Sequence, residues 1–321
     1  MSLPPFKNIL LRAPNWIGDH VLAADFYAGL RAAFPTTQIT LVCSAGMEAL
    51  LPDDWFDEVE IAPARRGLKA WRFWWSLRAR RFDLALQLPS SLRSASQLWL
   101  TRAPVRVGYA DAGAGFLLSR SRPWQGRASG KHKAALYREL LELVLGSSAP
   151  ERKPDRSTGD GPIVIAPGAS IRLREWPGFA ELIPALRKAY PEKEIRIVGN
   201  QDHTLWEHRV QTWNDPAVEN WIGLTDLPDL AELCAEASLV IANDSGVAHI
   251  AASLAGAPTV VLFGPGDPVY VMPRGNAVAV TPRALDCAPC ESARCRAPHG
   301  YQACLRSISV QDVLSKLPAL R

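Results

Sequence analysis

Leu239-Val-Ile-Ala-Asn-Asp-Ser-Gly-Val-Ala-His249 is the stretch of sequence that decides the fold of this chain. Its first four residues are apolar and mostly β-branched or aliphatic, which predicts a buried strand. The polar residues after them predict a short turn that opens a helix over roughly 246–255. A strand that leads through a turn into a helix is the repeating unit of an α/β fold. The free N–H groups and the positive dipole end at the start of such a helix suit a phosphate or a diphosphate.

The side chains of this turn are candidates to bind the rest of such a ligand. They are Asp244, Ser245 and His249, with Gly246 at the predicted start of the helix. Asp and Ser are also common helix caps. The segment alone therefore leaves two interpretations open, a ligand-binding turn and an ordinary capped helix.

A parallel arrangement stands near the N-terminus. Residues 9–12 predict a buried strand, and Ala13-Pro-Asn-Trp-Ile-Gly-Asp19 predicts a turn into a helix over 20–34. A glycine in such a turn lets a substrate approach the backbone closely, and the carboxyl edge of a parallel sheet is where open α/β folds bind ligands. Asp19 is therefore a candidate general base. The alternative is a helix-terminal acid that contributes only ~0.3–1 kcal/mol.

Apolar runs alternate with helical patterns along the whole chain, which is typical of βαβ units. The expected strands are 9–12, 39–43, 84–88, 105–107, 163–166, 195–198, 239–242 and 259–263. A length of 321 residues favours two domains, and the polar stretch 146–161 is the expected linker. We therefore expect two Rossmann-like domains, 1–150 and 151–321, that face each other across a cleft. No GxGxxG or Walker sequence is present, which argues against a dehydrogenase or a P-loop NTPase.

Composition and charge narrow the class of protein. The chain is 48% hydrophobic, as in soluble globular proteins. No signal peptide is visible at residues 1–6, and the longest apolar stretch, 247–263, is interrupted by His, Ser, Gly and Pro, so a cytoplasmic location is expected. Residues 1–150 carry a net charge of +7 and residues 151–321 a net charge of −3.

Much of the positive charge lies in the run Arg65–Arg81, where bases alternate with tryptophans. The aromatic density favours an interfacial helix on an anionic membrane over nucleic acid as the partner. The alternative is a helix whose tryptophans pack inward and whose bases form a solvated face.

Two further loops follow predicted strands. Arg172 and Arg174 come after the strand 163–166, where guanidinium groups can complement a diphosphate. Salt bridges to Glu175 or to surface acids are the alternative. Asp202 or His203, after the strand 195–198, can bind ribose hydroxyls or cap a helix.

Six sequence blocks together resemble a known family, the ADP-heptose:lipopolysaccharide heptosyltransferases, which are inverting glycosyltransferases of GT-B architecture. The blocks are Ala13–Asp19, Ser90-Ser-Leu-Arg-Ser-Ala95, Pro167-Gly-Ala169 with Trp176-Pro177, Asn243–His249, Phe263-Gly-Pro-Gly-Asp-Pro268, and the cysteines Cys287, Cys290, Cys295 and Cys304. The cysteine block resembles that of the type II enzymes, which add the second heptose of the inner core.

The resemblance implies a division of labour. The first domain is expected to bind the lipopolysaccharide core acceptor, heptosyl-Kdo₂-lipid A, through Asn15 and Arg93, with Asp19 as the base. The second is expected to bind ADP-heptose through six residues: Arg174, Asp202, Asp244, Ser245, Gly246 and His249. The family has a lysine shortly before the Trp-Pro pair, and Arg174 is the expected substitute for it. Asp244 would repel a diphosphate and is expected to accept hydrogen bonds from sugar hydroxyls.

Cofactors are the least constrained part of the prediction. Arg174 and the helix terminus could stabilise the departing ADP without a metal. The use of a loosely bound magnesium ion stays an alternative. The spacing Cys287-x₂-Cys290-x₄-Cys295-x₈-Cys304 is close to that of a structural zinc site. Reduced packing thiols and redox pairing are the alternatives.

The expected activity is heptose transfer to the inner core, at the inner face of the inner membrane and without nucleic acid as a partner. The alternatives are a family member that adds the first or third heptose, and a non-catalytic, membrane-docked nucleotide-sugar-binding protein.

Overall fold

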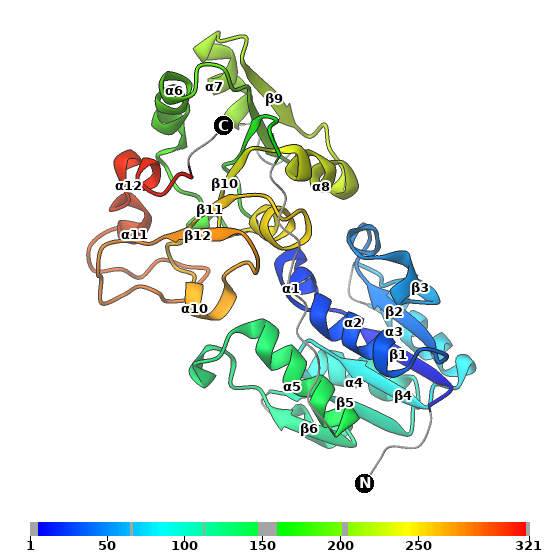
Figure 1. The fold of residues 1–321 in the computed structure, drawn as a ribbon. Helices are drawn as coiled ribbons and strands as arrows, with labels where there is room; N and C mark the ends of the chain where they lie inside the picture. The colour runs from blue at the N-terminus through cyan, green and yellow to red at the C-terminus, as the bar shows by residue number, and fades with distance from the viewer. Residues whose placement is uncertain (1–5, 65–66, 112, 147–158, 201–204, 319–321) are drawn as a thin grey trace. The chain divides into compact units, whose positions relative to one another are not determined.

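The computed structural model describes residues 6–64, 67–111, 113–146, 159–200 and 205–318. The chain divides into two compact units, Met1–Arg152 and Lys153–Arg321 (Figure 1). Most of the expected linker, residues 147–158, lies outside the described residues.

The first unit is a six-stranded sheet in the order β3-β2-β1-β4-β5-β6, and all of its strand pairs are parallel. This is the order of a doubly wound Rossmann sheet. The strands are β1 (Asn8–Arg12), β2 (Gln38–Cys43), β3 (Glu58–Ile61), β4 (Leu84–Gln87), β5 (Val105–Ala110) and β6 (Arg120–Pro123). The helices are α1 (Ile17–Leu22), α2 (Ala24–Ala33), α3 (Leu68–Ser76), α4 (Leu92–Leu100) and α5 (Lys133–Leu145). Helices α1, α2 and α5 pack together, and α3 packs against α4.

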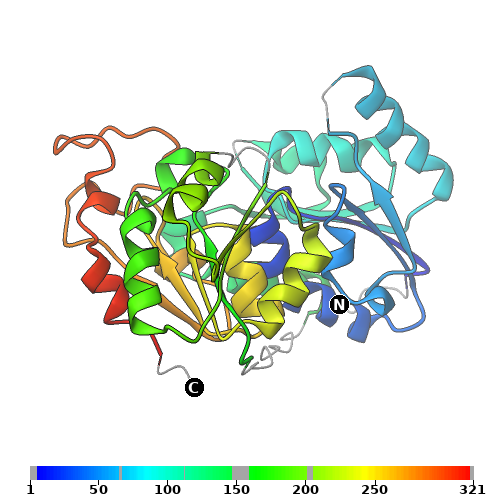
Figure 2. The ribbon, with the colours of Figure 1, turned by 90° about the horizontal axis from the view of Figure 1, so that it is seen from above.

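The second unit repeats this plan with the order β12-β11-β10-β7-β8-β9, again with every pair parallel. Its strands are β7 (Ile163–Ala166), β8 (Ile195–Gly199), β9 (Val218–Ile222), β10 (Leu239–Asn243), β11 (Thr259–Leu262) and β12 (Ala277–Val280). Its helices are α6 (Phe179–Ala189), α7 (Leu205–Trp213), α8 (Leu227–Glu236), α9 (Gly246–His249), α10 (Pro268–Val271), α11 (Ala303–Arg306) and α12 (Val310–Leu314). In Figure 2 the green helix α6 and the yellow helices α8 and α9 lie on opposite faces of this sheet.

The central strands are buried on both faces, which is why their sequences are continuous apolar runs. Ile9, Leu10 and Leu11 of β1 have no exposed surface. Leu10 belongs to the core cluster under α3 and α4, together with Trp74 and Leu98. The expected α/β fold with two Rossmann-like units is confirmed.

All eight expected strands are formed, and four further strands were not predicted. These four, β3, β6, β9 and β12, are the edge strands of the two sheets. Their residues are largely exposed or half-buried. Polar residues interrupt the sequences of β3, β6 and β9, whereas β12, Ala-Val-Ala-Val, is a short apolar run that the prediction missed.

Two expected helices differ from the prediction. The helix over 20–34 is divided at Ala23 into α1 and α2, and α1 already begins at Ile17, so Asp19 lies inside its first turn. The helix over 246–255 consists of α9 and a π-helical turn, Ile250–Leu254. None of the described helices is both long and apolar enough to cross a membrane.

Candidate functional site

Both candidate sites lie where the strand order of a sheet reverses. In the first unit β1 and β4 are neighbours, and in the second unit β7 and β10 are neighbours. Loops that leave the carboxyl ends of such strands diverge to opposite faces of the sheet and leave a crevice for a ligand. The sequence blocks that predicted binding follow these four strands.

Asp19 forms an ion pair with a residue that the sequence analysis missed. Its Oδ2 lies 2.7 Å from Nζ of Lys133, the first residue of α5. Both side chains keep part of their surface exposed, 22% for Asp19 and 15% for Lys133. The ammonium group therefore orients a carboxylate that solvent and substrate can still reach. No local pattern connects two residues that are 114 positions apart.

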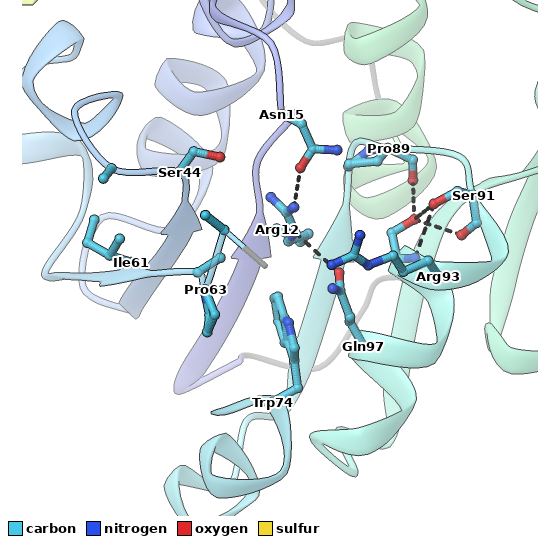
Figure 3. Close-up of a pocket in the computed structure, with 14 residues that line it drawn as sticks. Arg12, Asn15, Ser44, Ile61, Pro63, Trp74, Pro89, Ser91, Arg93 and Gln97 are labelled. Carbon is cyan, nitrogen blue, oxygen red and sulfur yellow. Dashed lines mark hydrogen bonds between the residues drawn. The ribbon is translucent and has the colours of Figure 1, made fainter. Parts of the chain in front are cut away.

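Asn15 and Arg93 line one pocket of about 510 Å³ in the first unit. The pocket is drawn in Figure 3. Arg12 is central to it, although the sequence analysis treated that residue only as the end of a strand. Its guanidinium donates to Oδ1 of Asn15, to the carbonyl oxygen of Ala13 at 2.6 Å and to Oε1 of Gln97 at 3.4 Å. Burial lowers the pKa of Arg12 to about 10 because water no longer solvates the charge.

In the second unit Asn243 joins the two loops at the strand reversal. It is fully buried. Its amide donates to the carbonyl oxygen of Pro167 at 2.6 Å, and its Oδ1 accepts from the backbone N–H of Trp176 at 2.9 Å. The loop after β7, which carries Arg174, is thereby fixed to the end of β10.

Arg174 is held between two carboxylates. Its Nη1 lies 2.8 Å from Oδ2 of Asp244, which is only 3% exposed, and its Nη2 lies 3.4 Å from Oε2 of Glu291. Arg172 is exposed and stands outside this cluster. Of the two arginines that the sequence left open, the structure places Arg174 beside the Asp244 turn. Asp244 therefore has a cationic partner that the sequence analysis did not assign to it.

Ser245 does not act as an ordinary helix cap. It occupies the N-cap position of α9, but its side chain makes no capping hydrogen bond. Its Oγ is buried without a hydrogen-bond partner among the described residues. Gly246 begins the helix, and His249 is buried in its last turn. Because Ser245 makes no capping hydrogen bond, the capped-helix interpretation is wrong for this side chain. A buried hydroxyl without a partner is costly unless a ligand satisfies it.

Glu291 reaches this cluster from the cysteine-rich segment. Its Oε1 accepts from the backbone N–H of Asp267 at 2.6 Å, and its own N–H donates to the carbonyl oxygen of Pro265. A methyl group at Gly266 would lie 2.1 Å from Oδ2 of Asp244. The turn around Gly266 therefore packs directly on the Asp244 carboxylate.

The structure does not bring the four cysteines of the expected zinc site together as a metal-ligand set within the described residues. They are Cys287, Cys290, Cys295 and Cys304, and all four are free. Within the described ranges no three His, Cys, Asp or Glu residues are grouped to hold a metal ion. Cys304 is buried, and burial raises the pKa of its thiol.

Two residues were expected to bind the ribose of the sugar nucleotide. Asp202 and His203 lie outside the described residues.

The base-aromatic run is partly buried and partly exposed. Trp74 of α3 faces the core and is 2% exposed, whereas Trp71 is 48% exposed and stacks on Trp75 with ring centroids 5.1 Å apart. Arg78 lies over the Trp75 ring at 3.8 Å. Arg80 is paired with two acids of β3, Glu58 and Glu60. Arg65 and Arg66 lie outside the described residues.

Comparisons with known proteins agree on one family. The family model for glycosyltransferase family 9 (heptosyltransferase) matches residues 70–300. The chain is 26% identical to lipopolysaccharide heptosyltransferase 2 of Escherichia coli strain K12, over 98% of each chain. It is equally identical to lipooligosaccharide heptosyltransferase 2 of Haemophilus ducreyi, over 98% of this chain and 99% of that one. The solved structure of E. coli ADP-heptose lipopolysaccharide heptosyltransferase II has the same fold, with a TM-score of 0.76 and 23% identity over 96% of both chains.

Proposed function

The chain belongs to glycosyltransferase family 9, the heptosyltransferases, and from this membership we propose its reaction. It transfers heptose from ADP-L-glycero-D-manno-heptose to the lipopolysaccharide inner core, at heptosyl-Kdo₂-lipid A, with inversion. The observation that carries this proposal is the similarity to lipopolysaccharide heptosyltransferase 2 over 98% of both chains. The GT-B fold class, with two Rossmann-like units, agrees with it.

Asp19 is the general base in this proposal. Its carboxylate takes the proton from the acceptor hydroxyl as that oxygen attacks the anomeric carbon of the heptose. Lys133 holds the carboxylate at 2.7 Å and limits its rotation. A positioned base typically supplies ~10²–10⁴-fold in rate.

The second unit binds the donor through Arg174, Asp244, Ser245, Gly246 and His249. ADP gains negative charge as the glycosidic bond breaks, and the guanidinium of Arg174 stabilises that charge. The buried hydroxyl of Ser245 and the N-terminal N–H groups of the helix supply further donors. Asp244 accepts from heptose hydroxyls, and Asp202 binds the ribose.

We propose that catalysis requires no metal, because arginine and helix N–H groups already face the leaving group. A magnesium requirement is the alternative, and turnover measured with excess EDTA distinguishes the two. The cysteine segment has a structural role, which is to position Glu291 beside Arg174.

The acceptor is a membrane lipid, so we propose a cytoplasmic enzyme that associates peripherally with the inner face of the inner membrane. The exposed Trp71, stacked on the half-buried Trp75, is with the neighbouring bases Arg72 and Arg78 the proposed contact with anionic lipid. This combination of charge and interfacial aromatics suits reversible binding without a membrane span.

Incubation of the protein with ADP-heptose and a series of truncated lipopolysaccharides tests the proposal. Mass spectrometry should find one added heptose on the acceptor that already carries one heptose. Addition to Kdo₂-lipid A, or only to an acceptor with two heptoses, would instead identify a first- or third-heptose transferase. Tight ADP-heptose binding without transfer to any acceptor would identify a non-catalytic binding protein.

A further inference from the structure

The pocket beside β1 and β4 contains two arginines and no acid. Its lining includes Arg12, Arg93, Asn15 and Gln97, and none of its lining residues is Asp or Glu. Arg12 is only 6% exposed. Its three side-chain hydrogen bonds all go to neutral oxygens. Its guanidinium carbon also lies 5.8 Å from the centroid of the Trp74 ring. A buried charge is normally paired with an opposite charge, and beyond this ring and the neutral oxygens Arg12 has no anionic partner among the described residues.

The second arginine increases the excess of positive charge. The side chain of Arg93 extends toward Arg12 (Figure 3). Burial is the main cause of the lowered pKa of Arg12, and the positive charge of Arg93 acts in the same direction. Neither guanidinium has a carboxylate partner within the described part of the chain. Two like charges that face one pocket are stabilised when an anion enters it.

The pocket also has donors left for such an anion. A guanidinium carries five N–H donors, and the hydrogen bonds of Arg12 use three of them. The two that remain, with those of Arg93, match the bidentate geometry of a carboxylate or phosphate. Ser91 caps α4 at the pocket wall, so the positive end of that nine-residue helix adds to the field.

We propose that this pocket binds a carboxylate on the acceptor, namely that of the Kdo sugar next to the heptose that receives the new unit. The inference rests on the proposed function and specifies which part of the acceptor the first unit reads. Asn15, bonded to Arg12, precedes Asp19 by four residues, and four residues span at most about 14 Å. A sugar acid adjacent to the reacting sugar fits that reach better than the more distant phosphates of lipid A.

Calorimetry in the absence of ADP-heptose tests the assignment. It compares the binding of a heptosyl-Kdo disaccharide, which carries the carboxylate, with the binding of its uncharged carboxamide. The wild-type protein should bind the carboxylate about 10- to 100-fold more tightly, as expected for hydrogen bonds between charged groups. Arg12→Met and Arg93→Gln should each reduce this ratio toward one. Arg93 is exposed, so its substitution keeps the test valid even if Arg12→Met fails to fold. Arg120→Gln, an exposed arginine of the same unit outside the pocket, should keep the wild-type ratio, and ADP affinity should stay unchanged throughout.

Equal binding of the carboxylate and the carboxamide by the wild-type protein would overturn the proposal, and so would an undiminished ratio in Arg93→Gln. A second pair of ligands, the full acceptor with and without its lipid A phosphates, separates the two sources of negative charge. Loss of affinity on dephosphorylation but not on amidation would assign the pocket to phosphate and overturn the sugar-acid proposal. Heptose transfer by the wild-type protein, measured separately, reports on the proposed function. If the protein transfers heptose but binds the carboxylate and the carboxamide equally, only the pocket assignment is refuted. If it prefers the carboxylate but transfers no heptose, only the proposed reaction is refuted.

Discussion

Among single residues, Asp19 has the most direct chemical role in the proposed reaction. Its carboxylate is partly exposed and is oriented by Lys133. Asp19→Asn keeps the shape of the side chain but removes the proton acceptor. We expect turnover to fall by at least ~10²-fold while ADP affinity stays within twofold, because the base acts on the acceptor. Single-turnover kinetics and ADP calorimetry measure the two effects, and near-normal turnover would contradict the assignment.

Arg174 and Arg172 form a matched pair for a second prediction. Only Arg174 lies beside Asp244, whereas Arg172 is exposed. Arg174→Ala should weaken ADP binding by about tenfold or more and leave adenosine binding nearly unchanged, since the lost partner is the diphosphate. Arg172→Ala should affect neither ligand. Equal losses for ADP and adenosine in Arg174→Ala would show that the residue is structural.

At the scale of elements, α3 presents its tryptophans to two environments. Trp74 packs into the core, while Trp71 is exposed and stacks on the half-buried Trp75. Because Arg80 is neutralised by Glu58 and Glu60, the positive charge without an acidic partner in the described helix and its continuation lies on Lys69, Arg72, Arg78 and Arg81. The burial of Trp74 agrees with the inward-packing interpretation of this run, and its binding to a membrane surface stays a proposal.

The surface role of α3 gives a third prediction. A variant with Arg72, Arg78 and Arg81 changed to Gln should bind anionic vesicles more weakly, because each base near such a surface contributes ~1 kcal/mol. Arg80→Gln alone should bind like the wild type. Co-sedimentation at low and high salt measures this. If the triple variant and the wild type bind equally, the acceptor is captured by another surface.

The segment over 287–304 brings an acid, Glu291, to Arg174, and we propose that its role is structural. Cys290 is exposed, and its neighbour Glu291 contacts Arg174. We expect Cys290→Ala to leave the KM for ADP-heptose within twofold, and Glu291→Ala to change it several-fold because Arg174 loses a positioning contact. Steady-state kinetics decide this, together with metal analysis of protein purified without chelator. Stoichiometric metal whose removal abolishes turnover but not folding would refute a purely structural segment.

At the scale of the whole molecule, the stability of the first unit should depend on pH through His20. This side chain has no exposed surface, and burial lowers its pKa to about 4. The unfolded chain, with a pKa near ~6.5, binds the proton more readily. The contribution of neutral His20 to stability is therefore complete above about pH 6.5 and is lost as the pH falls toward 4.

Urea denaturation at pH 7.5 and pH 5 tests this dependence. The linkage relation predicts a loss of about 2 kcal/mol in the free energy of unfolding on going to pH 5. His20→Gln cannot titrate and should show a smaller difference between the two pH values. If the variant retains the full difference, other groups cause the acid sensitivity.

The sequence by itself determined the central strands, the two-unit α/β fold and most of the residues around the candidate sites. Buried parallel strands need apolar side chains on both faces, so they leave continuous runs that can be read locally. Polar and glycine residues directly after those runs mark the carboxyl edge, where Asp19 and Asp244 lie. The edge strands β3, β6 and β9 escaped prediction because solvent on one side removes the need for such a run, whereas the four-residue apolar run of β12 was missed.

Only the tertiary structure decided which side chains meet across long stretches of sequence. Lys133 reaches Asp19 and Glu291 reaches Arg174, because the strand order of each sheet brings separate loops to the same edge. The lack of an acid beside the Arg12 guanidinium is likewise invisible in sequence, where an arginine at the end of an apolar strand has no known neighbours. Its burial and the absence of an acid around it follow from packing, since burial and electrostatic pairing depend on distances in space rather than on spacing along the chain.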